Sequence, residues 1–306
     1  MLQKLINHVY RYPKSNWKNI QRFGGLYSYY KMLKGKKEMI RSSHFLPEII
    51  SYPNGLPIYF LTGKNYLYQT LFCAHSLVKN SQQKFRFILI DDGSFDEYLI
   101  NEIKQQMPNV ELILNDEIEL NLYKVLPKAK YPYLHYKRKV YPHIKKLTDI
   151  HTLSPDTYKL VLDSDMLFWS NPTEMITWLQ DPKDCTYMLD TVESYGFDKQ
   201  LMKSLCGQDI PTLLNVGIFG IDSNIINWDD LEIWSKTLEE KQSPSYFLEQ
   251  ALSAMLVAGK NHIVLNKAEY VVNPEGSNPN LNEVKLHHYV DISKKYYFNT
   301  AWKRFI

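Results

Sequence analysis

In the first half of the chain, short apolar runs alternate with longer segments whose apolar residues recur at helical spacing. The runs at 56–62, 85–90 and 110–114 have the length and composition of buried strands, and residues 65–80 and 96–107 have a helical period. Parallel strands require crossover connections, which are normally right-handed helices. The order therefore predicts a parallel, Rossmann-like α/β sheet with helices on its faces.

Polar residues stand at the ends of these strands. Thr62 closes the first run, and Asp91 and Asp92 follow the second. In open α/β sheets, ligands bind at the carboxyl ends of the strands. We therefore predict that these three residues bind a ligand; the alternative is that they only begin turns.

A later strand ends in two carboxylates. In the stretch YKLVLDSDMLFWSNP, residues 158–172, five mostly apolar residues precede Asp163, Ser164 and Asp165. With the period of a strand, the two aspartates point to the same side of the chain. Two close negative charges repel each other unless a cation lies between them, and carboxylate oxygens suit Mg²⁺ or Mn²⁺. The triplet thus predicts a divalent cation site.

A helix start follows the triplet. In Asn171-Pro172-Thr173-Glu174, Asn171 is the predicted N-cap, Pro172 the first helical residue and Glu174 the end of a capping box. A chain with 17 aspartates contains an Asp-x-Asp triplet by chance alone. The metal hypothesis therefore depends on this context of strand, acid pair and helix.

Composition limits the class of protein. A chain of 306 residues with 44% apolar content can bury the core of one large α/β domain with a small appendage. Its three cysteines, Cys73, Cys185 and Cys206, have neither ligand-like spacing nor an even number, which favours a reducing compartment and excludes a cysteine zinc site. The sequence shows neither a transmembrane-length apolar run nor a secretory signal, so we expect a soluble, cytoplasmic protein.

Basic charge is concentrated at the N-terminus. Residues 1–41 hold ten Lys and Arg and a single acid, Glu38, for a net charge of +9, whereas the remainder carries −6. Aromatic residues lie between these cations, which suits an anionic membrane surface. We predict a basic, aromatic helical extension over 1–44 that binds the inner face of the cytoplasmic membrane peripherally. The alternative is an extension that packs its aromatic residues on the main domain; we expect no nucleic-acid partner.

Further motifs follow one another in a fixed order: Arg138-Lys139-Val140-Tyr141-Pro142, Asn215-Val216-Gly217, Glu249-Gln250 and the segment 288–296, which opens on His288-Tyr289 and contains Lys294. Together with Asp163-Ser164-Asp165 they resemble the motifs of the GT-A glycosyltransferases, which use nucleotide-sugar donors and a metal held by an Asp-x-Asp motif. Within these, the chain looks most like the retaining group that includes the lipopolysaccharide galactosyltransferases and glycogenin. The resemblance covers roughly residues 55–302.

The resemblance implies a GT-A fold for residues 45–306, with a nucleotide-binding sheet, flanking helices and a smaller acceptor-side region. It implies a Mn²⁺ or Mg²⁺ site formed by Asp163, Asp165 and His288. His287 competes with His288, which is favoured by its spacing of six residues from Lys294. The implied donor-binding residues are Thr62, Asp91, Asp92, Arg138, Asp163, Ser164, Gly217 and Lys294, and the implied catalytic residues are Asp190, Asn215, Glu249 and Gln250.

Two departures leave the mechanism open. Asp291 replaces a glycine of the family's C-terminal motif, so we expect the loop to run differently or the contact of Lys294 to shift. Asp91-Asp92-Gly93-Ser94 is more typical of inverting GT-A families. Retention is favoured, with Glu249 or Gln250 in the sugar pocket; in an inverting enzyme Glu249 would be the general base.

The implied function is a metal-dependent hexosyltransferase. It would move a sugar from a nucleotide-sugar donor, with UDP-sugar favoured, to a glycan, a lipid-linked or a protein acceptor. One alternative is a catalytically inactive binding protein on a GT-A-like scaffold. A nucleotidyltransferase is a weaker alternative, because Thr62-Gly63-Lys64-Asn65 is too short to resemble the Gly-rich loop of that class.

Overall fold

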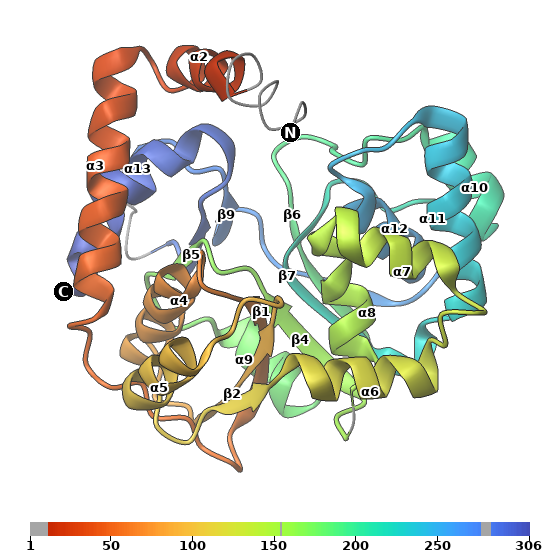
Figure 1. Cartoon of the computed structure of the whole chain (residues 1–306), viewed down its shortest axis with the longest axis horizontal. Helices are drawn as coiled ribbons and strands as arrows, with labels where there is room; N and C mark the ends of the chain where they lie inside the picture. The colour runs from red at the N-terminus through yellow and green to blue at the C-terminus, as the bar shows by residue number, and fades with distance from the viewer. Residues whose placement is uncertain (1–11, 154, 277–282) are drawn as a thin grey trace.

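The computed structural model describes residues 12–153, 155–276 and 283–306, and its centre is a seven-stranded sheet (Figure 1). The strand order is β3-β2-β1-β4-β7-β6-β8. The bounds are β1 Leu56–Thr62, β2 Phe85–Asp91, β3 Glu111–Ile113, β4 Tyr158–Leu162, β6 Cys185–Leu189, β7 Leu214–Asp222 and β8 His262–Val264. A second sheet has the order β5-β10-β9, with β5 Met166–Phe168, β10 Leu286–His288 and β9 Tyr270–Val272.

The first half of the large sheet is parallel, as the alternation of strands and helices predicts. β1 pairs with β2 and with β4, and β2 pairs with β3, all in parallel. The connecting helices are α4 Leu67–Lys79 and α5 Glu97–Gln106. β7 is antiparallel to both β4 and β6, so the parallel order ends at β4. The predicted α/β class is confirmed.

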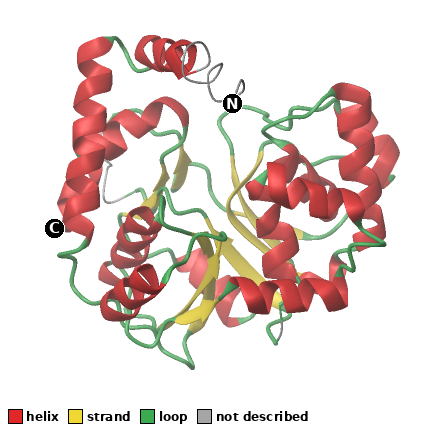
Figure 2. Cartoon of the chain, in the orientation of Figure 1, coloured by secondary structure: helices red, strands yellow, loops and turns green. Residues whose placement is uncertain are grey.

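Helices cover both faces of the sheet (Figure 2). Alternate residues of β1 face opposite layers: Ile58 and Phe60 belong to one apolar cluster and Tyr59 to the other. The first cluster includes residues of α3 (Leu26–Ser43), α4, α5 and α9, and the second includes residues of α6, α7, α8, α11 and α12. The further helices are α6 Asn115–Val125, α7 Pro132–Val140, α8 Lys145–His151, α9 Thr173–Gln180, α10 Lys199–Cys206, α11 Trp228–Gln242, α12 Leu248–Val257 and α13 Lys294–Asn299.

The helix start after the acid pair differs from the prediction. α9 begins at Thr173, its N-cap residue is Pro172, and no side chain caps it, so the predicted capping box with Asn171 is wrong. The Glu174 carboxylate turns instead to Lys285 Nζ at 2.6 Å and accepts a hydrogen bond from Tyr270. An ion pair with a half-buried lysine is a stronger interaction than a bond to a backbone amide, so it determines the orientation of Glu174.

Two helices precede the sheet, α2 Tyr12–Arg22 and α3 Leu26–Ser43. α3 lies beside α13 along one edge of the molecule (Figure 1). The two backbones come close at Gly35, where an added Cβ would be 2.1 Å from the Phe298 carbonyl oxygen. The part of the predicted extension at 1–11 lies outside the described residues. None of the described helices combines the length and apolarity needed to cross a membrane.

A buried histidine lies between the layers on the α8 side. His151 is 5% exposed, its Nδ1 lies 2.9 Å from Ser223 Oγ, and Lys159 Nζ donates to the same hydroxyl. Burial, with the neighbouring charge of Lys159, lowers the pKa of His151 to about 3. The imidazole is therefore neutral in the folded chain at every pH where most proteins are stable.

This histidine predicts an acid-sensitive contribution to stability. Its pKa is lowered on folding, so below about pH 6.5 the unfolded chain binds a proton that the folded chain does not, and stability falls as the pH decreases toward 3. We expect His151→Gln to reduce the loss of unfolding free energy between pH 6.5 and 4.5 by about 2 kcal/mol. Urea denaturation at the two pH values measures it; an unchanged loss would contradict the burial argument.

Candidate active site

The carboxyl ends of three adjacent strands form the floor of the candidate site. Thr62 on β1 is in register with Asp91 on β2, and β4, which precedes Asp163, pairs with the other side of β1. The Asp163 amide donates to the Gly217 carbonyl at 2.8 Å, which joins the end of β4 to β7. The topology thus brings together residues that lie far apart in the sequence.

The small second sheet brings a histidine to the acid pair. β5 follows Asp165 directly and pairs with β10 so that Met166 opposes His288. His288 Nε2 lies 3.2 Å from Asp165 Oδ1 and 3.6 Å from Asp163 Oδ2. One ligand atom from each of Asp163, Asp165 and His288 lies within 4.8 Å of the others.

The histidine is oriented by a fixed hydrogen bond on its other side. His288 Nδ1 is 3.1 Å from Asn215 Oδ1, an oxygen that also accepts a bond from the Gly217 amide. Because an amide oxygen only accepts, Nδ1 carries a proton. In the neutral ring the Nε2 lone pair therefore faces the carboxylates, where a metal would bind it, whereas a protonated ring pairs with Asp165, whose charge raises the pKa of His288 against the effect of burial. Nε2 is buried and has no hydrogen bond of good geometry. Two carboxylates and such an imidazole fit Mn²⁺ or Mg²⁺, with the nitrogen donor favouring Mn²⁺.

His287 faces the opposite way. Its ring packs edge-on to Trp169, and its Nδ1 lies 3.1 Å from the Tyr289 hydroxyl. Burial lowers the pKa of His287 to about 4, so this ring is a neutral part of the core. Of the two candidate histidines, only His288 reaches the acids.

Two lysines neutralise the acids from either side. Lys146 Nζ, on α8, lies 2.6 Å from Asp163 Oδ1, and Lys294 Nζ, at the start of α13, lies 3.3 Å from Asp165 Oδ2. Burial opposes ionisation of Asp165, but Lys294 and His288 together hold its pKa well below the usual range. Asp165 is therefore ionised, and the lysines of α8 and α13 lie against the two acids.

A line of polar groups continues from His288 into the interior. Asn215 donates through Nδ2 to Asp190 Oδ2 at 3.0 Å, and Gln250 Nε2 lies 3.5 Å from the same oxygen. All three side chains are buried. Asp190 follows β6, Asn215 lies on β7 and Gln250 lies on α12, so the structure brings these three predicted catalytic residues together.

Glu249 lies beside Lys146. Its Oε2 lies 3.3 Å from Lys146 Nζ, and its side chain is 7% exposed. Burial raises the pKa of Glu249 to about 7, although the charge of Lys146 opposes the shift. A carboxyl group with a pKa near neutrality can exchange a proton under physiological conditions.

The predicted donor residues on β1 and β2 are held in turns. Thr62 and Ser164 each bond to the Thr70 hydroxyl, at 2.7 and 2.8 Å, which links β1, α4 and the Asp-x-Asp triplet. Asp91 Oδ1 accepts three backbone amides of the following turn. The Asp92 amide donates to the Thr62 carbonyl at 2.9 Å, so Asp92 stays beside the end of β1.

Arg138 does not contact the acid pair. Its guanidinium is bound by buried Asp149, with Nε at 2.6 Å from Oδ1, and by Glu119. The cation that reaches Asp163 is Lys146, eight residues further along. Sequence reasoning missed Lys146, and its only signal was a lysine pair in the helical segment before β4. The donor-binding role of Arg138 stays a prediction.

Asp291, which stands where the family motif has glycine, has a backbone φ of +45°. This is the left-handed region that favours glycine, so the aspartate adopts a conformation that costs an ordinary residue about 1 kcal/mol or more. Its carboxylate pairs with Arg22 of α2. With this turn in place, Lys294 reaches Asp165 three residues later.

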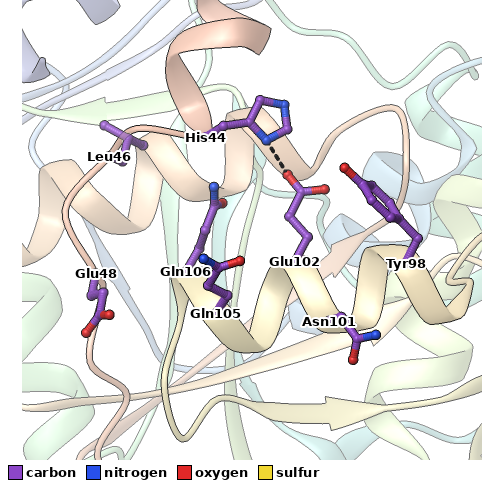
Figure 3. A pocket seen from close by; sticks show the side chains of 8 residues that line it. All are labelled: His44, Leu46, Glu48, Tyr98, Asn101, Glu102, Gln105 and Gln106. Atoms are coloured by element: carbon purple, nitrogen blue, oxygen red, sulfur yellow. Dashed lines mark ion pairs between the residues drawn. The ribbon is translucent and has the colours of Figure 1, made fainter.

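A separate hollow lies between the end of α3 and α5 (Figure 3). It encloses about 320 Å³ and is lined by His44, Leu46, Glu48, Tyr98, Asn101, Glu102, Gln105 and Gln106. His44 Nδ1 lies 2.7 Å from Glu102 Oε1 across it. None of the predicted site residues lines this hollow, so it is distinct from the acid cluster.

Comparison with solved structures identifies the fold. The galactosyltransferase LgtC, in complex with donor and acceptor sugar analogues, is similar with a TM-score of 0.51 and 15% identity over 81% of this chain and 93% of that one. Mouse xyloside xylosyltransferase 1 is similar with a TM-score of 0.50 and 11% identity over 78% and 97%. The bifunctional glycosyltransferase WbbM has a TM-score of 0.50 and 13% identity over 83% of this chain, which spans only 51% of its length.

The chain therefore has the GT-A glycosyltransferase fold. Its structural neighbours include the group of LgtC, as the motifs predict. No protein-family model and no curated protein sequence matches the chain.

The acid cluster predicts metal binding that depends on Asp165. We expect the wild-type protein to bind Mn²⁺, and Asp165→Asn to weaken binding by about a hundred-fold because one charged ligand is lost. Isothermal titration with MnCl₂ measures it. Asp209→Asn, which changes an exposed aspartate elsewhere, is the matched control, and equal affinities in all three proteins would refute the site.

The different burial of Lys146 and Lys294 predicts that replacing them lowers the unfolding free energy by different amounts. The Lys146 side chain is 11% exposed and contacts two acids, whereas Lys294 retains 39% exposure. In metal-free protein we expect Lys146→Gln to lower the unfolding free energy by about 3 kcal/mol, because it leaves Asp163 and Glu249 uncompensated, and Lys294→Gln by about 1 kcal/mol or less. Urea denaturation compares them; similar losses would contradict the difference in burial.

Proposed function

We propose that the chain is a metal-dependent glycosyltransferase that moves a hexose from a nucleoside diphosphate sugar, with UDP as the favoured carrier, to an acceptor hydroxyl. The observation that carries the proposal is the cluster of Asp163, Asp165 and His288 between two lysines. This cluster stands at the carboxyl ends of the strands of a GT-A sheet, where ligands of such sheets bind. The neighbouring structures, which are named as glycosyltransferases, support the same class.

The chemistry requires stabilisation of a leaving diphosphate. The bond between the anomeric carbon and the diphosphate oxygen breaks, a bond to the acceptor oxygen forms, and the acceptor proton is released. When bound, a divalent cation supplies Lewis-acid stabilisation of the departing phosphate charge. Lys294 and Lys146, already beside the acids, add fixed positive charge where that negative charge develops.

The buried polar side chains next to His288 are suited to binding the donor sugar. Asn215, Asp190 and Gln250 form a buried set of donors and acceptors next to His288. Hydrogen-bonding groups held in fixed positions can select the hydroxyls of one hexose. We propose that these residues bind the donor sugar and orient its anomeric carbon toward the acceptor.

We propose retention of configuration. In an inverting reaction the general base acts on the face of the sugar opposite the leaving group. Glu249 pairs with Lys146, the lysine that contacts Asp163, which favours a position on the leaving-group side. This arrangement supports Glu249 as a group near the departing diphosphate. ¹H NMR of the first product anomer tests this, and an inverted product would refute it.

Donor hydrolysis tests the function directly. We expect slow release of UDP from a UDP-hexose with Mn²⁺, no release with EDTA, and a loss of at least a hundred-fold in kcat/KM in Asp165→Asn, because the charge on the leaving group is no longer neutralised. A coupled assay for UDP measures it across several UDP-hexoses. The Asp209→Asn variant is the control and keeps wild-type activity.

A second experiment, combined with the hydrolysis assay, separates an enzyme from a binding protein. A thermal-shift titration with UDP, with and without Mn²⁺, reports binding by mass action independently of turnover. Metal-dependent stabilisation without hydrolysis of any donor would favour the inactive binding protein. Turnover that is indifferent to EDTA and to Asp165→Asn would refute the proposed function.

A further inference from the structure

Helix α3 has two faces of different character. Met32, Gly35 and Met39 are buried against the body of the protein. The opposite side carries an exposed stripe at 26, 30, 33, 37 and 40, which is the spacing of one helix face, and its members are Leu26, Tyr30, Leu33, Lys37 and Ile40. Leu26 and Tyr30 are 68% and 69% exposed. The apolar members, Leu26, Tyr30, Leu33 and Ile40, form an apolar strip that faces solvent and that Lys37 interrupts.

Cations flank this strip. Lys31, Lys34, Lys37 and Arg41 are exposed on α3, and Lys18 is exposed on α2. The one acid between residues 12 and 43, Glu38, is already contacted by Lys303 at 3.2 Å. Within the described residues, Lys31, Lys37 and Arg41 have no ion-pair partner. The face therefore combines exposed apolar side chains with uncompensated positive charge.

Aromatic residues extend the face toward α2. Trp17 on α2 is 59% exposed, and Tyr27 at the start of α3 is 80% exposed. Tryptophan and tyrosine are favoured at membrane interfaces, where an apolar ring and a polar group meet different media. The α2–α3 face is defined as Trp17, Lys18, Leu26, Tyr27, Tyr30, Lys31, Leu33, Lys34, Lys37, Ile40 and Arg41.

Charge distinguishes this face from the other exposed apolar surface. On α6, Leu120 and Tyr123 are also exposed, but α6 begins with Asp116 and Glu117 and also carries Glu119. Apolar exposure alone thus occurs on both sides of the molecule. The apolar side chains of α6 lie among acids as well as lysines, whereas the exposed apolar side chains of the α2–α3 face lie among cations.

The face is held rigidly on the folded body. Gly35 packs directly on the Phe298 carbonyl of α13, and Arg22 pairs with Asp291. Phe23, Met32 and Met39 belong to the same apolar cluster as α4 and β1. A surface fixed in this way loses little conformational freedom on binding, which favours association.

We propose that the α2–α3 face binds an anionic lipid membrane surface. The helices lie in the interface with the apolar strip and the aromatic rings among the acyl chains and the lysines at the headgroups. A second copy of the chain is a poorer partner, because pairing two such strips brings Lys34, Lys37 and Arg41 against like charges. The proposal does not depend on sugar transfer.

Vesicle co-sedimentation of the full chain tests the proposal. We expect binding to phosphatidylcholine vesicles that contain phosphatidylglycerol, little binding to phosphatidylcholine alone, and weaker binding at high salt. Replacing Lys34, Lys37 and Arg41 by Gln should weaken binding by about ten-fold or more, since each cation near the surface contributes separately. The matched control replaces Lys124, Lys128 and Lys139, exposed lysines on the α6–α7 side, by Gln and keeps wild-type binding.

Replacing apolar residues of the strip tests the proposal independently of charge. Leu33→Gln with Ile40→Gln changes two exposed side chains and should weaken vesicle binding without changing the far-UV circular dichroism spectrum. The proposal is overturned if the wild-type chain binds neither kind of vesicle, or if the two triple-Gln variants lose vesicle binding to the same extent. If the wild-type chain sediments as a dimer in lipid-free buffer and the Leu33/Ile40 double variant sediments as a monomer, the face binds a second copy instead. That result would also overturn the proposal.

Discussion

The architecture of the site depends on compensating the charge of Asp163 and Asp165, two acids that adjoin the same strand end. Their carboxylates meet Lys146 from α8, His288 from β10 and Lys294 from α13. The last two elements are neighbours in the sequence, but they lie more than 100 residues beyond the acids. Without cations on both sides, two partly buried carboxylates at this spacing would repel each other and unfold the strand end or take up a proton. The acid pair therefore requires the small sheet and both flanking helices to be in place.

The β5–β10 pairing makes the compensation possible. β5 starts one residue after Asp165, and the Tyr289 amide donates to the Asp165 carbonyl at 2.9 Å, so the backbones of the two segments are joined at the site itself. Asn215 then fixes the histidine ring from β7. The imidazole faces the acids through contacts between protein segments alone, and such preorganisation lowers the cost of forming the site.

Local periodicity was enough to predict that β1, β2 and β3 pair in parallel, since each is a short apolar run joined to the next by a helical segment. The choice of His288 over His287 also followed from spacing, and His288 is the histidine that the structure places beside the two acids. Lys146 and the end of the parallel order at β4 were not predictable, because each depends on which distant segments pair. The capping box failed for a similar reason: Lys285, 111 residues away, draws Glu174 from the helix terminus.

The N-terminal helices are part of the electrostatics of the site as well as of the surface. Lys36 of α3 lies over the rings of Tyr68 and Phe298, and burial, followed by the charge of Lys294, lowers its pKa. Arg22 holds Asp291 in the turn from which Lys294 begins its helix. Because α3 buries one face against α13 and exposes the other, the packing and membrane interpretations of this basic segment are compatible. Each uses a different side of the same helix.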